Sequence, residues 1–345
     1  MRGLTRKMSS PVRSPFRRDL TGLKESDVTT YIVRRLLQSI VVLLLVSIFV
    51  FLAIRLMPGD PIKLMVYESN LTGLSPQQLA DLRHEYGLDK PLALQYLDWL
   101  GGVLQGNLGI SVFTKTPVAK EIFRRLPITF EIGLWSLLLS IVIGVPVGII
   151  SAVRRGTWID QLVVTLSNIG VTIPVFWLGV ILMLVFSLYL KWLPVMGFTP
   201  LTEDPGMHFK QLVMPVICSS LFSVAALARQ TRSSMLEVMH QDYIRTAWSK
   251  GLNENAIIFK HALKNGLIPV ITTLGLSARG IVGGSTVVET VFSIPGMGRL
   301  LVSAVSNLDY AYVQGIILII AATVVAINVL IDIVYGWADP RIRYS

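Results

Sequence analysis

The sequence predicts an all-α integral membrane protein with six transmembrane helices. Of its 345 residues, 52% are hydrophobic and only 15% are charged, and the mean hydropathy is +0.63. Six apolar stretches approach or exceed the roughly 20 residues that a bilayer-crossing helix needs. This composition is typical of membrane proteins and argues against a soluble domain.

The six predicted spans follow one another along the chain, and the fourth is the shortest. They cover residues 36–57, 128–153, 162–190, 212–228, 267–292 and 311–331. Four of them contain a proline, namely Pro146, Pro174, Pro215 and Pro269. Helices in lipid tolerate proline when neighbouring helices satisfy the freed carbonyl groups.

The basic residues predict which way the spans point. An even number of spans places both termini on one side, and that side carries 19 Lys and Arg against ten on the other. Long loops contribute little to this rule, and without residues 58–127 the comparison is 19 against three. Both termini are therefore expected in the cytoplasm, and the net charge of +10 reflects membrane topology instead of a nucleic-acid-binding face.

The amino-terminal segment and the single cysteine carry no catalytic signal. Residues 1–30 are expected to form a cytoplasmic extension, either a solvated tail, which is favoured, or a surface-lying segment. The apolar run that follows is too long for a signal peptide. Cys218 lies in an apolar stretch, and buried packing is the favoured interpretation.

Two loops are long enough to have structure of their own. The external segment, residues 58–127, is expected to form a small helical cap, with Ser75 capping a helix that begins at Pro76 and with Pro91 starting another. Such a cap either receives a soluble partner or shields the pore mouth, and the sequence leaves both open.

The cytoplasmic segment, residues 229–266, predicts an elbow of two helices. Ser234 and Glu237 form a capping box, and Gly251 suits a left-handed helix end. Asn253 can cap a second helix that stops near Gly266. The elbow is expected to expose apolar residues for a groove in a partner protein, namely Tyr243, Ala247, Leu252 and Ile257.

This elbow and six further motifs resemble one protein family. The segment 242–272, DYIRTAWSKGLNENAIIFKHALKNGLIPVIT, is similar to the coupling loop of binding-protein-dependent ABC importer permeases of the dipeptide/oligopeptide/nickel branch. The other motifs appear in the same order, as MPGDP at 57–61, YGLDKPLALQYLDWL at 86–100, GNLGIS at 106–111, RLPITFE at 125–131, ETVFSIPGMGRLL at 289–301 and DPRIR at 339–343. The GNLG motif has Asn107 where the family pattern has Asp.

The resemblance implies a type I ABC importer permease of MetI-like fold in the bacterial plasma membrane, with residues 31–345 as the transmembrane domain. It implies a second homologous permease, two ATP-binding subunits, an extracytoplasmic solute-binding protein and membrane lipid as partners, and no nucleic acid. The sequence contains no GxxxxGK[ST] phosphate loop. The chain is therefore expected to be non-catalytic and to bind no cofactor, with ATP and Mg²⁺ used by the partner ATPases.

The candidate site residues form three groups, from the resemblance and from the residues of the spans themselves. The ATPase-coupling group is Asp242, Tyr243, Arg245, Thr246, Ala247, Lys250, Gly251, Leu252, His261 and Asn265. The translocation-pathway group is Arg279, Gly280, Gly283, Gly284 and Glu289. The external group, expected to receive the binding protein, is Asp60, Tyr96, Trp99 and Asn107.

Arg279 is the one cation near the middle of a predicted span, and it has two interpretations. It either lines the pathway and meets a substrate carboxylate, or forms a salt bridge with the partner permease, Glu131 or Asp332, which is slightly favoured. The nearby glycines allow either close helix packing across the interface with the partner permease or a wide pathway, and packing is favoured. Glu289, at the outer end of the span, is expected to be able to reach water.

Other functions are less well supported by the sequence. The substrate implied is a di- or oligopeptide, with nickel chelates, glutathione-like solutes and oligosaccharides as alternatives. An intramembrane protease lacks its motif, because His84 and Glu85 have no second His at zinc-ligand spacing. A metal site at His240 and His261 is improbable for the same reason. A secondary transporter or channel would show internal repeats, which the sequence lacks.

Overall fold

The computed structural model describes residues 25–56, 62–63, 66, 75–283 and 285–338, and this part of the chain is helical throughout apart from loops and one isolated bridge. Residues 1–24 of the predicted extension (residues 1–30) lie outside the described residues. The last residues of the extension belong to α1, which begins at Glu25. The all-α class is confirmed.

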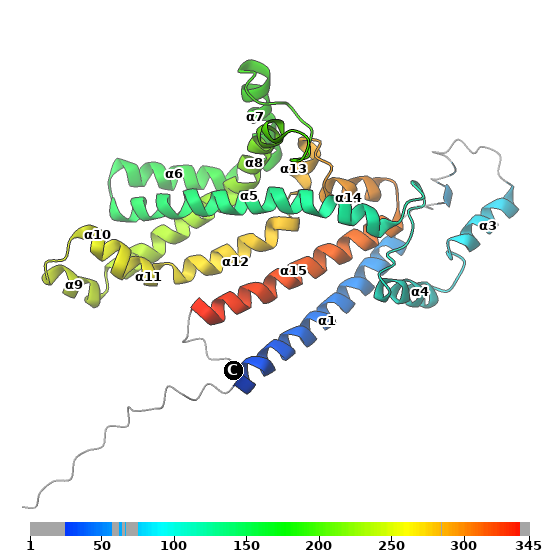
Figure 1. Ribbon diagram of the computed structural model, residues 1–345, viewed down its shortest axis with the longest axis horizontal. Coiled ribbons are helices and arrows are strands. Elements are labelled where there is room, and N and C mark those ends of the chain that lie inside the picture. Colours follow the sequence, from blue (N-terminus) through cyan, green and yellow to red (C-terminus); the bar gives the residue numbers. More distant parts are fainter. Residues whose placement is uncertain (1–24, 57–61, 64–65, 67–74, 284, 339–345) are drawn as a thin grey trace, which may run out of the picture.

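Four long helices have the length and hydropathy of single membrane spans. They are α1 (Glu25–Arg55), α5 (Val118–Val153), α8 (Pro205–Met239) and α15 (Tyr310–Ala338). Their apolar residues form a broad surface because lipid, not water, surrounds such helices. α12 (Ile268–Gly283) packs against α5, α8 and α15, and α1 packs against the other side of α15 (Figure 1).

The third predicted span is wrong as a continuous helix. The structure has α6 (Trp158–Thr172), α7 (Val175–Leu182) and a π-helix η1 (Met183–Tyr189), and the two parts meet at an angle of 105°. The break falls at Ile173, which is extended with ψ 126°, and at Pro174. Proline removes a backbone donor and forces the preceding residue out of helical geometry.

The fifth predicted span is also interrupted. Its residues form α12, which ends at Gly283, and the separate short α13 (Thr286–Val291). α14 (Met297–Ser306) then folds back beside α13. By length and composition the described residues hold four spans, or five if the bent α6–η1 pair is one span, so the number six is not reproduced by this criterion.

Close approach of α5 and α8 depends on two glycines of α5. A Cβ at Gly144 would lie 2.9 Å from Leu227 Cβ, and a Cβ at Gly148 would lie 2.5 Å from the backbone oxygen of Ala228. Small residues four apart let two helix backbones approach in this way. Cys218 is 1% exposed in the neighbouring apolar cluster, as expected from the sequence.

An ion pair holds α6 to α8 at one end of this bundle. Arg232 Nε and Nη2 donate to the two oxygens of Asp160 at 2.7 and 2.9 Å, and Ser151 of α5 donates to the same carboxylate at 2.6 Å. Asp160 is buried, so removal of one partner would leave a costly unpaired charge. The three helices are thereby fixed close to the turn where α8 ends.

The two ends of the bundle carry different structures. At one end lie α9 (Asp242–Ser249), α10 (Glu254–Ala256), the π-helix η2 (Ile257–Ala262) and α11 (Leu263–Gly266), on the same side as the start of α1 and the end of α15 (Figure 1). At the other end lie α3 (Pro76–Glu85) and α4 (Leu92–Leu104).

The expected helical cap is confirmed where the structure describes it. Ser75 caps α3 with a reciprocal capping box to Gln78, and Pro76 takes the first helical position. Pro91 is the N-cap of α4. Phe51 of α1 packs edge-on against Tyr96, with ring centroids 5.4 Å apart, which attaches α4 to α1.

Candidate functional site

The elbow (residues 240–266) is a compact unit between α8 and α12. Asn253 caps the second helix as expected, since its Oδ1 accepts from Ala256 N at 2.8 Å. Gly251 has φ +74° and follows the C-cap residue Lys250. This backbone conformation favours glycine, so the expected left-handed helix end is confirmed.

The predicted start of the elbow is wrong. Ser234 and Glu237 do not cap a helix, because α8 continues without interruption to Met239. Ser234 is buried inside α8, and its Oγ accepts from Gln230 Nε2 at 3.1 Å. The first elbow helix, α9, begins after Gln241 instead. Packing of α8 along α5 and α6 extends it beyond the local capping signal.

The elbow has its own apolar core, which corrects part of the expected exposed surface. Ala247 and Ile257 were expected to face outward, but they are 6% and 0% exposed. They lie in a cluster with Ile244, Ala262 and Met235 of α8. The apolar side chains on its outer surface are Tyr243, Trp248, Leu252 and Phe259.

One contact joins two helices within the elbow, and another attaches the elbow to the bundle. Asn265 Nδ2 donates to Tyr243 Oη at 2.9 Å, which joins α11 to α9. A Cβ at Gly266 would lie 2.8 Å from Met235 Sδ, so α11 rests directly on α8. Most of the other predicted coupling residues are exposed, and some of them form local contacts. Arg245 Nη1 lies 3.6 Å from Asp242 Oδ1, and Thr246 Oγ1 donates to Asp242 O at 3.0 Å.

A hydroxyl-lined cavity, here called the hydroxyl cleft, lies between α5, α7, α8 and α12. Its volume is ≈ 480 Å³, and among the described residues its lining holds six hydroxyl residues, eight apolar or glycine residues, and no Asp, Glu, Lys or Arg. Its hydroxyl groups belong to Ser136, Ser219, Ser223, Thr273, Ser277 and Ser285. Ser219 Oγ is buried and has no hydrogen-bond partner within the described part of the chain. Neutral hydroxyls both donate and accept, so this surface suits uncharged polar groups.

The expected pathway residues lie on or near this cleft. Gly280 lines it, and a Cβ at Gly280 or Gly283 would meet nothing within 4 Å. Neither glycine packs closely within the described part of this chain, and the favoured packing across the interface with a partner permease stays a prediction. Gly284 lies outside the described residues.

Arg279 is exposed and has neither of its expected partners in this chain. Glu131 Oε1 instead lies 2.8 Å from His208 Nε2, and Asp332 Oδ2 lies 3.3 Å from Arg35 Nε. A salt bridge within the chain to Glu131 or Asp332 is therefore contradicted. A pathway role and a partner permease remain as explanations for this cation.

Glu289 does not reach water, contrary to expectation. It is fully buried, and its Oε1 accepts from Thr129 Oγ1 at 2.8 Å and from Ser285 Oγ at 2.7 Å. Its Oε2 accepts from Arg299 N at 3.0 Å. A Cβ at Gly296 would lie 2.3 Å from the Glu289 carboxyl carbon. The carboxylate therefore joins α5, α13 and α14 and orients Ser285 at the hydroxyl cleft.

The external candidates mostly attach the cap to the bundle. Tyr96 Oη lies 2.9 Å from Ser47 Oγ, and Trp99 packs beside Tyr96, with ring centroids 6.1 Å apart. Asn107 is exposed, and its Oδ1 accepts from Gly109 N at 2.9 Å in a local turn. Asp60 lies outside the described residues.

Asp309 connects the GNLGIS segment to α15. Its carboxylate accepts from Ser111 Oγ and, weakly, from Tyr312 N at 3.4 Å at the start of the helix. Burial raises the pKa of the Asp309 carboxyl, although these hydrogen bonds act in the opposite direction. Within the described residues no three His, Cys, Asp or Glu side chains gather in a metal-binding arrangement.

Comparisons with known proteins agree with the sequence resemblance. Residues 144–344 match the family profile described as binding-protein-dependent transport system inner membrane component, and residues 28–133 match its N-terminal companion. A probable peptide ABC transporter permease of Sinorhizobium fredii is 41% identical over 91% of this chain and 99% of its own. A di/tripeptide transport system permease of Pseudomonas aeruginosa is 40% identical over 92% of this chain and 99% of its own.

Two further similarities extend these results. An oligopeptide transport system permease of Bacillus subtilis is 41% identical over 92% of this chain and 100% of its own. An inward-facing structure of the MetNI methionine ABC transporter shares the fold, with a TM-score of 0.50 and 18% identity, over 63% of this chain and 96% of that chain.

Proposed function

The chain belongs to the family of inner membrane components of binding-protein-dependent transport systems, and on this premise we propose that it is the permease subunit of an ATP-driven importer of short peptides. The names of relatives about 40% identical over nearly the whole chain support peptides as the solute. Nickel chelates, glutathione-like solutes and oligosaccharides are the alternatives that a competition assay would test.

The elbow is the observation that carries this proposal. It has its own core and exposes apolar side chains among basic ones, namely Arg245, Lys250, Lys260 and Lys264. A short helix with exposed apolar residues fits a groove of a partner protein. We assign that groove to an ATP-binding subunit, one of two in a complex with a second homologous permease and an extracytoplasmic binding protein.

The connectivity suggests how ATP binding would act on the solute pathway. The elbow joins α8 to α12, and both helices line the hydroxyl cleft. Because Gly266 contacts Met235 closely and α12 starts two residues after α11, displacement of the elbow moves both walls of the cleft. This is a hinge-like transmission between two packed states, which is the basis of alternating access.

The hydroxyl cleft is our candidate for part of the pathway. A surface of neutral hydroxyls can bond to peptide backbone groups irrespective of the solute's side-chain charge. Arg279, next to the lining residue Gly280, is proposed to meet the terminal carboxylate. The excess of basic residues at the elbow end supports cytoplasmic termini.

The test uses the assembled complex and compares two exposed aromatic residues at the same end of the bundle. Phe259 is 63% exposed on the elbow, and Trp158 is 72% exposed at the start of α6. We expect Phe259→Ala to reduce copurification of the ATP-binding subunit and ATP-dependent dipeptide uptake, whereas Trp158→Ala leaves both unchanged. Equal effects of the two substitutions would contradict the docking role of the elbow.

A further inference from the structure

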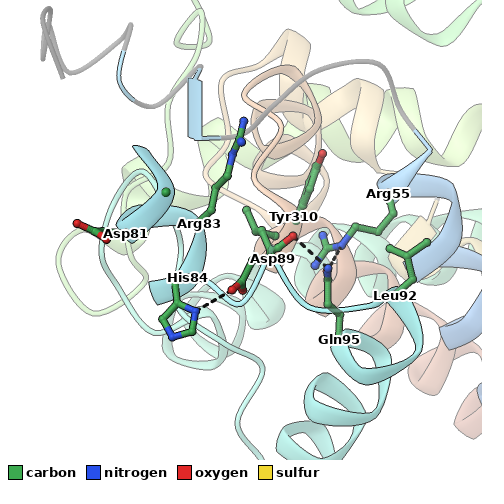
Figure 2. A pocket seen from close by; sticks show the side chains of 10 residues that line it. Arg55, Asp81, Arg83, His84, Asp89, Leu92, Gln95 and Tyr310 are labelled. Carbon is green, nitrogen blue, oxygen red and sulfur yellow. Dashed lines mark hydrogen bonds and ion pairs between the residues drawn. The ribbon is translucent and has the colours of Figure 1, made fainter. Parts of the chain in front are cut away.

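A second cavity, here called the outer cavity, lies at the end of the bundle opposite the elbow. Its volume is ≈ 660 Å³, and residues from the end of α1, α4, the 107–115 segment and the start of α15 line it. Arg55, Gln95 and Tyr310 also line a neighbouring cavity. Figure 2 shows these three side chains and, as a separate contact, the His84–Asp89 pair.

Three donors that line the outer cavity lack an acceptor. Arg55 Nη1, Trp99 Nε1 and Gln314 Nε2 are buried and have no hydrogen-bond partner within the described part of the chain. Gln314 is only 3% exposed. A buried donor without an acceptor is unfavourable, and three around one cavity are unusual in a folded protein. Their common complement is a group with acceptor oxygens only.

Arg55 is held in position for such a group. Its guanidinium carbon lies 5.0 Å from the Phe51 ring centroid and 4.6 Å from that of Tyr310. Its Nε donates to Gln95 Oε1 at 2.8 Å, which fixes the plane of the guanidinium group. The buried Nη1 is left for an oxyanion, and phosphates and carboxylates are the oxyanions that guanidinium groups bind best.

The position along the helices favours a phosphate of the membrane. Arg55 is the last residue of the apolar stretch of α1, and Gln314 lies in the first turns of the α15 stretch. Both therefore lie near one membrane boundary, where lipid phosphates lie and where Trp and Arg side chains gather.

An apolar groove adjoins the outer cavity at Leu108. Its volume is ≈ 590 Å³, Leu108 lines both spaces, and Ser47 is the one residue with a polar side chain in its lining. The walls come from α1, α4, α5 and α15, including Leu44 and Ile319. A donor-lined cavity continuous with an apolar groove matches an amphiphile better than a water-soluble solute.

We propose that one phospholipid binds here, with its phosphate oxygens accepting from Arg55, Trp99 and Gln314 and with an acyl chain in the apolar groove. The three donor atoms are buried in the absence of the lipid, so the proposed binding requires their side chains to rotate toward the phosphate. Two carboxylates also line the outer cavity, Glu85 and Asp98, and Asp98 is paired with Lys90 at 2.6 Å. The lipid would attach α4 to the bundle where the cap is built.

The test is native mass spectrometry of the assembled complex after purification in nanodiscs of phosphatidylglycerol or phosphatidylcholine. We expect a retained phospholipid in the wild type, and a loss of affinity of roughly tenfold or more in Arg55→Gln, because a hydrogen bond to a charged group is removed. Trp99→Phe keeps an aromatic side chain but removes the indole N–H, so it should show a smaller loss than the removal of a cation. Arg124→Gln, an exposed cation at the start of α5, is the matched control.

Three results would overturn the lipid site. Wild-type retention in both Arg55→Gln and Trp99→Phe would show that these donors do not hold the lipid. An equal loss in Arg124→Gln would show a general charge effect. Displacement of the retained phospholipid by millimolar dipeptide, or retention of dipeptide instead of lipid, would assign the cavity to a solute carboxylate.

Discussion

Replacement of Glu289 by Gln tests whether a buried carboxylate holds the outer end of the bundle together. The carboxylate accepts from Thr129 and Ser285 at one oxygen and from Arg299 N at the other. A glutamine amide has a single acceptor oxygen. If that oxygen faces the Arg299 N–H, the NH₂ group faces the two hydroxyls, which must then accept and lose the buried acceptor of their own O–H groups. The space cannot adjust easily, because Gly296 lies against the carboxyl group.

The expected magnitude follows from these three bonds. Losing one hydrogen bond to a charged acceptor costs about 1.5–3 kcal/mol, and leaving a buried hydroxyl O–H without an acceptor costs about 1–3 kcal/mol more. We therefore expect Glu289→Gln to lower the free energy of unfolding by about 4 kcal/mol, a large effect for one substitution. Peptide uptake should fall as well, because Ser285 loses the bond that orients it at the hydroxyl cleft.

Thermal unfolding of the detergent-purified chain, followed by tryptophan fluorescence, measures this effect. The control is Glu203→Gln, since Glu203 is exposed in the loop before α8. We expect a fall in Tm on the order of 10 °C for Glu289→Gln and no change for the control. A Glu289→Gln protein as stable as the wild type would refute the reasoning, because it would mean that residue 289 does not act as a carboxylate acceptor.

Three further predictions test other parts of the structure. Gly251→Ala places a side chain at φ +74°. The backbone strain should cost about 1 kcal/mol in the elbow and reduce the uptake per ATP hydrolysed. Gly87→Ala, at φ +62° in the cap, carries the same strain and should leave that ratio unchanged. Arg279→Gln should lower uptake while the complex still assembles, measured by copurification, whereas Arg124→Gln should not; normal uptake by assembled Arg279→Gln would exclude the pathway role. Burial raises the pKa of Asp309, so the folded state disfavours its ionised form and the stability of the wild type falls as pH rises through that pKa. Asp309→Asn removes this titration, so its Tm relative to that of the wild type should be higher at pH 8 than at pH 4.5. The same difference in Tm at both pH values would contradict this.

The long spans could be predicted from the sequence because an apolar helix in lipid needs no tertiary partner to satisfy its backbone. Pro174 shows where this reasoning stops. Pro146 and Pro215 lie inside helices that continue through them, whereas Pro174 separates two helices by 105°. Whether a proline bends a helix or ends it depends on neighbouring helices, which one sequence does not reveal.

The elbow shows the same limit at smaller scale. Gly251 and Asn253 act through their own backbone or side chain, so their roles could be predicted from local rules. Ser234 satisfied a local rule equally well, but packing of α8 overrode it. Ala247 and Ile257 were expected on the surface because the elbow's own apolar core could not be deduced from spacing alone.

The hydroxyl residues of the cleft follow a helical spacing that is visible in the sequence. Ser219 and Ser223 lie four residues apart, as do Thr273 and Ser277, and this spacing places each pair on one helix face. Recognising that the two faces meet requires the packing of α8 against α12. The acceptor role of Glu289 was missed for the same reason, since its donors come from α5 and α14.

The most direct test of the central claim is uptake of a labelled dipeptide into proteoliposomes that contain this chain, a second homologous permease, the ATP-binding subunits and the solute-binding protein. We predict that uptake requires ATP and all four components. Phe259→Ala in the elbow should reduce this uptake sharply. Dipeptide uptake by this chain without ATP or without the ATP-binding subunits would contradict the account and would indicate a secondary transporter or channel.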